Sequence, residues 1–197
     1  MPTQTVIFLG PQGCGKGTQL KLLAERLAAL DPSRGILAPA MGNLLRSLAL
    51  KDTYAASLLR PILARGELVE YAVSVAEFGH YLLENLKEDQ HLLIDGFPRS
   101  LEQVALIDSA LRFYRRDAPA VVRIEITDEE ALKRLLARGR SDDIPEAIRA
   151  RLAWTRKAEK EIEAWFKGSA NYRVHEIDGS GTIEETQAKV RAALGVN

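Results

Sequence analysis

The stretch Gly10-Pro-Gln-Gly-Cys-Gly-Lys-Gly-Thr-Gln19 (GPQGCGKGTQ, residues 10–19) places four glycines around a single lysine. Each glycine loses more conformational freedom on folding than any other residue, so this run indicates a backbone that must approach a ligand closely. It follows the apolar segment 5–9 and opens a helical pattern at 16–30. A glycine-rich turn between a buried strand and a helix directs backbone N–H groups and the helix dipole toward an anion. The stretch therefore predicts a phosphate-binding loop.

The loop departs from the commonest phosphate-binding pattern in one position. That pattern, G-x-x-x-x-G-K-[ST], has a hydroxyl directly after the lysine. Here Gly17 follows Lys16, and Thr18 comes one place later. We expect Lys16 to reach the transferred phosphate as a point charge and Thr18 to help hold a metal ion. Cys14 lies close to the amino terminus of the predicted helix, where the pKa of a thiol is commonly lowered.

Short apolar segments alternate with amphipathic ones along the rest of the chain. Segments 5–9, 91–94, 120–126 and 172–177 are predicted strands, and a fifth short strand is predicted near 36–37. Helical patterns cover 16–30, 42–50, 54–64, 70–87, 100–116, 128–138, 145–167 and 182–194. This alternation predicts an α/β fold, a doubly wound parallel sheet of about five strands with ligands at the carboxyl ends of the strands.

Composition narrows the class of protein. The 197 residues are 46% hydrophobic and 27% charged with a formal net charge of +0, which fits one globular domain and favours neither nucleic acid nor a membrane surface as partner. The single cysteine excludes an internal disulfide and a cysteine-built zinc site. Apolar runs are shorter than the ~18 residues of a membrane span, and the amino terminus lacks signal-peptide features. We therefore expect a cytoplasmic protein. As a separate expectation, it acts as a monomer.

The displaced threonine is informative, because GxxGxGKGTQ resembles the phosphate loop of adenylate kinases and their nucleoside monophosphate kinase relatives. The resemblance implies a fold of the P-loop NTPase type and Mg²⁺ bound together with ATP. It implies ATP contacts from Gly13, Cys14, Gly15, Lys16, Gly17 and Thr18.

A second segment, LLIDGFPRSLEQ (92–103), resembles the family's acceptor-site signature. Asp95 then holds Mg²⁺ through water, beside Thr18, while Arg99 and Gln103 hold the phosphate and the base of AMP. Their spacing of four places them on one helix face. The resemblance also assigns Gly96, Phe97 and Pro98 to the AMP site.

Two further segments resemble the helical block that binds the acceptor. MGNLLR (41–46) supplies Met41 and a second phosphate-binding arginine, Arg46, and GELV (66–69) supplies Glu67, Leu68 and Val69 to the AMP site. Met41 and Asn43 replace the threonine and aspartate of the family pattern. Gln103 favours AMP because an amide both donates to and accepts from adenine, whereas Met41 offers no hydroxyl and loosens that preference.

The segment RLLARGRSDDIPEAIRARL (134–152) resembles the family's lid region. The resemblance implies that Arg99, Arg138, Arg140 and Arg151 act with Lys16 in catalysis, with Arg134 and Arg138 on ATP and Arg140 and Arg151 also on AMP. The competing interpretation is a charged helix pair in which Arg140 bridges Asp142 and Asp143. The link is too short for the zinc-carrying insert of long-lid relatives, so no structural zinc is expected. DGSGT (178–182) lies where the family closes over adenine, which assigns Gly181 to ATP.

These resemblances predict a single domain, 1–197, with a helical acceptor-binding insert at 40–70 and a short lid at 138–144. The predicted reaction is transfer of the terminal phosphate of Mg·ATP to AMP, giving two ADP. One alternative is a UMP/CMP kinase or a kinase for another small acceptor. A GTP-dependent switch is less favoured because the sequence lacks an N-K-x-D-type guanine-reading segment. The third alternative is a catalytically silent nucleotide-binding module.

Overall fold

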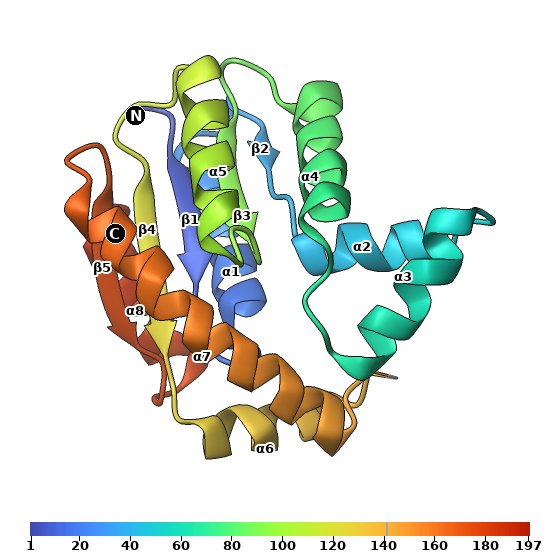
Figure 1. Ribbon diagram of the computed structural model, residues 1–197. Helices are drawn as coiled ribbons and strands as arrows, with labels where there is room; N and C mark the ends of the chain where they lie inside the picture. Colours follow the sequence, from blue (N-terminus) through green and yellow to red (C-terminus); the bar gives the residue numbers. More distant parts are fainter. Residues whose placement is uncertain (141) are drawn as a thin grey trace.

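A five-stranded sheet forms the centre of the computed structural model, which describes residues 1–140 and 142–197 (Figure 1). The strands lie in the order β2-β3-β1-β4-β5, and all neighbouring pairs are parallel. Their bounds are β1 Thr5–Leu9, β2 Ile36–Leu37, β3 His91–Asp95, β4 Ala120–Glu125 and β5 Arg173–Asp178. The predicted doubly wound α/β fold is confirmed.

Helices cover both faces of this sheet. Their bounds are α1 Lys16–Leu30, α2 Met41–Ala49, α3 Tyr54–Arg65, α4 Tyr71–Asn85, α5 Leu101–Phe113, α6 Asp128–Arg138, α7 Pro145–Gly168 and α8 Ile183–Leu194. Two of them end two or more residues before the prediction. The helix predicted for 100–116 ends at Phe113 because Arg115 has a left-handed φ of 53°, and the helix predicted for 70–87 ends at Asn85 because Leu86 is extended.

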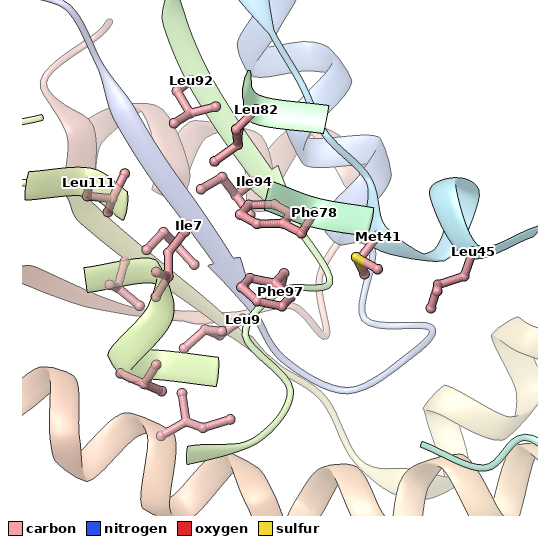
Figure 2. Close-up of a cluster of buried hydrophobic side chains, with 14 of the residues drawn as sticks. Ile7, Leu9, Met41, Leu45, Phe78, Leu82, Leu92, Ile94, Phe97 and Leu111 are labelled. Carbon is pink, nitrogen blue, oxygen red and sulfur yellow. The ribbon is translucent and has the colours of Figure 1, made fainter. Parts of the chain in front are cut away.

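The core divides at the sheet because successive strand residues point to opposite faces. On β1, Val6 and Phe8 face a cluster that includes residues of α1, α6 and α8, whereas Ile7 and Leu9 face a cluster with residues of α2, α4 and α5. Figure 2 shows the second cluster, in which Phe78 lies beside Phe97. The ring centroids of these two side chains are 4.2 Å apart. Packing on both faces holds the carboxyl ends of the strands in fixed positions.

Two regions leave this layered body (Figure 1). The helices α2 and α3 extend away from the sheet at the β2 side and lie within 40–70, the segment for which an acceptor-binding insert is predicted. The link between α6 and α7 corresponds to the predicted lid at 138–144, of which residue 141 lies outside the described residues. A membrane-crossing helix, long and apolar enough for a bilayer, is not found among the described residues.

Candidate active site

A cleft of about 1070 Å³ opens where β1 and β3 end, between the glycine-rich loop, α2, α6 and α7. Most of the residues predicted from the sequence to bind substrates line it. They are Gly13, Cys14, Gly15, Lys16, Gly17, Thr18, Arg46, Glu67, Val69, Asp95, Gly96, Pro98, Arg99, Arg134, Arg138, Arg140, Arg151 and Gly181. Met41, Leu68, Phe97 and Gln103 are outside this lining, as far as the described residues define it.

The loop after β1 needs glycine for two different reasons. A Cβ at Gly10 would lie 2.2 Å from the carbonyl oxygen of Ile124, so the loop passes too close to β4 for a side chain. Gly15 has open space around it but a φ of 98°, which non-glycine residues rarely adopt. Gly15 also precedes the first residue of α1 and has no side chain that could cap it. The first N–H groups of α1 therefore have no side-chain cap and are available to bind an anion in the cleft.

Lys16 lies folded over this loop. Its Nζ donates hydrogen bonds to the carbonyl oxygens of Gly10 (2.5 Å) and Pro11 (2.8 Å) and lies 3.6 Å from Cys14 Sγ. These carbonyls hold the ammonium at the edge of the cleft.

Cys14 does not have the lowered pKa expected from its position near a helix terminus. The side chain is 1% exposed, and burial raises the pKa of the thiol, although the nearby Lys16 ammonium opposes that shift. Burial prevails because the sheet and helices on this side enclose the sulfur, which the local sequence cannot indicate. The expectation of a lowered pKa was wrong.

Asp95 and Thr18 provide oxygen atoms at one end of the loop. Asp95 is the last residue of β3, and its Oδ2 lies 3.7 Å from the place that a Cβ at Gly17 would occupy. A carboxylate, a hydroxyl and substrate phosphates are the ligands that suit Mg²⁺, which keeps several waters in such sites. The described residues contain no group of three His, Cys, Asp or Glu side chains able to cage a metal by themselves. The donor set therefore fits an ion that arrives with the nucleotide.

Two arginines face the opposite part of the cleft. Arg99 donates from Nε to the carbonyl of Gly96 (2.7 Å), and its guanidinium lies 5.8 Å from the centroid of the Trp154 ring. Burial lowers the pKa of Arg99, and attraction to Asp95 only partly opposes it. Burial also lowers the pKa of Arg46, and the positive charge of Arg140 adds to that shift. Both guanidinium groups are partly removed from water and lie near other arginines, so a bound phosphate would stabilise their charged form.

Three residues that were expected to touch AMP are buried beneath the surface of the cleft. Met41 is 1% exposed and belongs to the same buried cluster as Phe97 (Figure 2). Phe97 is fully buried against Phe78. Gln103 is 2% exposed, accepts a hydrogen bond from the Arg99 backbone N–H at Oε1 (2.7 Å) and donates from Nε2 to Ser74 Oγ (2.9 Å).

The lid arginines are held by aspartates. Arg138 donates to both carboxylate oxygens of Asp143 at 2.8 Å each, and Arg151 Nη2 donates to Asp143 Oδ1 at 2.9 Å. Arg151 also donates to Asp142, at its carbonyl (2.7 Å) and at Oδ2 (3.2 Å). Burial alone would raise the pKa of Asp143, but the hydrogen bonds and charges of the two arginines prevail and lower it. The ion pairs with Asp142 and Asp143 that were foreseen for Arg140 are therefore formed by Arg138 and Arg151.

The third part of the cleft lies between α6 and the loop before α8. Arg134 Nη2 donates to the carbonyl of Gly179 (2.9 Å) and contacts Glu130, so it connects α6 to this loop. At Gly181 a Cβ would lie 2.6 Å from Glu185 Oε2, which keeps the loop close to the start of α8. The predicted adenine-binding segment therefore borders the cleft next to Arg134.

Helix α7 contributes residues that the sequence analysis did not assign. Trp154 lines the cleft and donates from Nε1 to the carbonyl of Gly66 (2.9 Å). Thr155 donates to Gln12 Oε1 (2.9 Å), which joins α7 to the phosphate loop. Glu159 is 7% exposed, and its pKa is raised by burial against the attraction of Lys16. Their spacing from Arg151 at helical intervals was the signal that could have placed them on the cleft face.

The fold and this cleft define a phosphate-loop nucleotide kinase: a parallel α/β sheet, an anion-binding loop and two separate groups of arginines around one space.

The comparisons with known proteins agree. The adenylate kinase family model matches residues 8–170. The chain is 35% identical over 199 residues to an adenylate kinase of Thermus thermophilus, covering 98% of each protein. It is 35% identical over 191 residues to one of Prochlorococcus marinus (strain MIT 9211), covering 97% of each. The chain belongs to the adenylate kinase family. It is a phosphotransferase, and its reaction is phosphorylation of AMP by ATP.

Proposed function

We propose that the cleft binds ATP and AMP at its two ends and transfers phosphate between them directly. The phosphate loop, with Lys16, holds the phosphates of ATP, and Arg134 and the loop at Gly181 hold its adenosine part. Arg46 and Arg99 hold the phosphate of AMP, next to the backbone of 66–69 and 96–98. The supporting observation is that the anion-binding loop and the Arg46–Arg99 pair border the same space.

In this arrangement a phosphate oxygen of AMP attacks the terminal phosphorus of ATP. The new P–O bond forms as the bond to the bridging oxygen of ADP breaks, so both products are ADP and the protein stays unmodified. Lys16, Arg138, Arg140 and Arg151 stabilise the negative charge on the transferring group and keep the reactants in line. Mg²⁺, bound through water to Asp95 and Thr18, would neutralise phosphate charge.

The lid must change its contacts for this to happen. Asp143 holds Arg138 and Arg151 by charge-assisted hydrogen bonds, and a phosphoryl group offers the same guanidinium groups equivalent acceptors. We propose that the insert at 40–70 and the lid at 138–144 close over bound substrates, which exchanges these partners and excludes water from the reacting phosphate.

ATP with a radioactive terminal phosphate tests the direct transfer. Incubated with AMP and the protein, it should place the label in ADP, with little in inorganic phosphate and none on the denatured protein. Label retained covalently on the protein would contradict direct transfer, and label released as inorganic phosphate would make the protein a hydrolase.

A further inference from the structure

Ser74 joins two parts of the acceptor side that the cleft lining does not reveal. It lies in the first turns of α4, directly after the segment 66–69 that borders the cleft, and it is 3% exposed. Its Oγ accepts a hydrogen bond from Gln103 Nε2 (2.9 Å). The same hydroxyl has the carbonyls of Glu70 and Tyr71 in reach, each at 3.1 Å, and donates its one hydrogen toward them.

This bond and one other fix the amide of Gln103. The backbone N–H of Arg99 can only donate, so the atom that faces it at 2.7 Å must be Oε1 of Gln103. The nitrogen Nε2 must then face Ser74. A flipped amide would bring two donors together at Arg99, in a place where the buried groups have little water to compensate.

Its two hydrogen bonds leave the amide with one further N–H and one further oxygen lone pair. Because Gln103 is 2% exposed, a base can pair with them only when the proposed movement of the insert at 40–70 opens a path to the amide. The Watson–Crick edge of adenine offers an acceptor at N1 and a donor at its 6-amino group, which match that pair. A 6-oxopurine has a donor at N1 and an acceptor at O6, so the same amide would have to flip to pair with it.

We propose that Ser74 is a positioning residue for the acceptor base: it holds the Gln103 amide in the orientation that accepts adenine and rejects 6-oxopurines. The proposal rests on the proposed function and on the role for Gln103 that the family resemblance implies, which is contact with the base of AMP. Ser74 acts through Gln103, on a helix, α4, that packs against α5 (Figure 1), and it is outside the cleft lining as the described residues define it.

Steady-state kinetics of Ser74→Ala with AMP and with inosine 5′-monophosphate test this role. One lost hydrogen bond should raise KM for AMP by about three- to tenfold. The kcat value and KM for ATP should stay within about twofold, and the preference for AMP over inosine monophosphate should fall. Ser74→Thr keeps the hydroxyl and should restore the preference. Ser57→Ala is the control for loss of a helical serine hydroxyl, because Ser57 also donates to a carbonyl three residues back but is exposed and does not contact Gln103.

An unchanged KM for AMP in Ser74→Ala would overturn the proposal, and so would an equal loss for ATP and AMP, or no recovery in Ser74→Thr. If Ser74→Ala does not fold, Ser74→Cys keeps the side-chain volume, weakens the bond and permits the same comparison. Failure of the reaction itself is distinguishable, because the wild-type protein would then form no ADP from ATP and AMP.

Discussion

Replacement of Gly17 by alanine should separate stability from activity. Gly17 is the second residue of α1 and already has helical backbone conformation, so alanine fits there without strain and reduces the freedom of the unfolded chain. The free energy of unfolding should rise by up to about 1 kcal/mol, which corresponds to about 2–4 °C in Tm for a protein of this size. The new methyl group, however, would lie 3.7 Å from Asp95 Oδ2, where we propose that water joins the carboxylate to Mg²⁺.

Disturbing such an outer contact of a metal ion commonly reduces activity by ~10–100-fold, and this is the loss we expect in kcat. Thermal unfolding and a coupled assay of ADP formation measure the two effects on the same preparation. Gly79→Ala in α4 is the control, since the described residues leave 4 Å of open space around a Cβ there, and it should gain stability with full activity. A Gly17→Ala protein with unimpaired kcat, or with a lowered Tm, would refute this explanation of the glycine after the lysine.

Three further outcomes follow from the same cleft. Lys16→Ala should fold normally and retain less than a tenth of the wild-type kcat, a loss above about 1.4 kcal/mol, and a greater residual rate would contradict its role at the phosphate. Cys14 should react with iodoacetamide much more slowly in the native protein than in guanidinium, because burial raises the pKa of its thiol; equal rates would show that the sulfur is accessible. Burial also raises the pKa of Glu159 above its ordinary value of 4.5, so the folded state keeps a proton that the unfolded state releases. The free energy of unfolding therefore falls as pH rises from 4.5 through the higher pKa of the folded state. Glu159→Gln should therefore raise Tm at pH 8 and leave it unchanged near pH 4, and a lower Tm at pH 8 would contradict this sign.

The sheet and the positions of the helices could be predicted because they depend on local periodicity. Apolar strands, helical spacing and the glycines of the phosphate loop are each visible within a few residues. The end of α5 was not, because it depends on Arg115 adopting a left-handed φ that no local sequence signal requires.

The candidate site was predictable only to the level of which segments meet. The carboxyl ends of parallel strands converge, which placed Asp95 opposite the phosphate loop. The surroundings of each side chain depend on distant segments: Met41 and Phe97 lie in a core completed by α4, and Cys14 is enclosed by elements from across the chain. The pairing of Arg138 and Arg151 with Asp143, rather than a bridge from Arg140, likewise depends on how α7 packs against α6.

The choice of acceptor tests the central claim most directly. With Mg·ATP as donor, kcat/KM should be measured for AMP, UMP and CMP on the wild-type protein, by a coupled assay that detects ADP. The orientation of the Gln103 amide matches adenine and cytosine but not uracil, which disfavours UMP. The family of the chain favours AMP over CMP, so AMP should have the highest value. A higher kcat/KM for UMP or CMP would contradict the assignment of AMP as the acceptor.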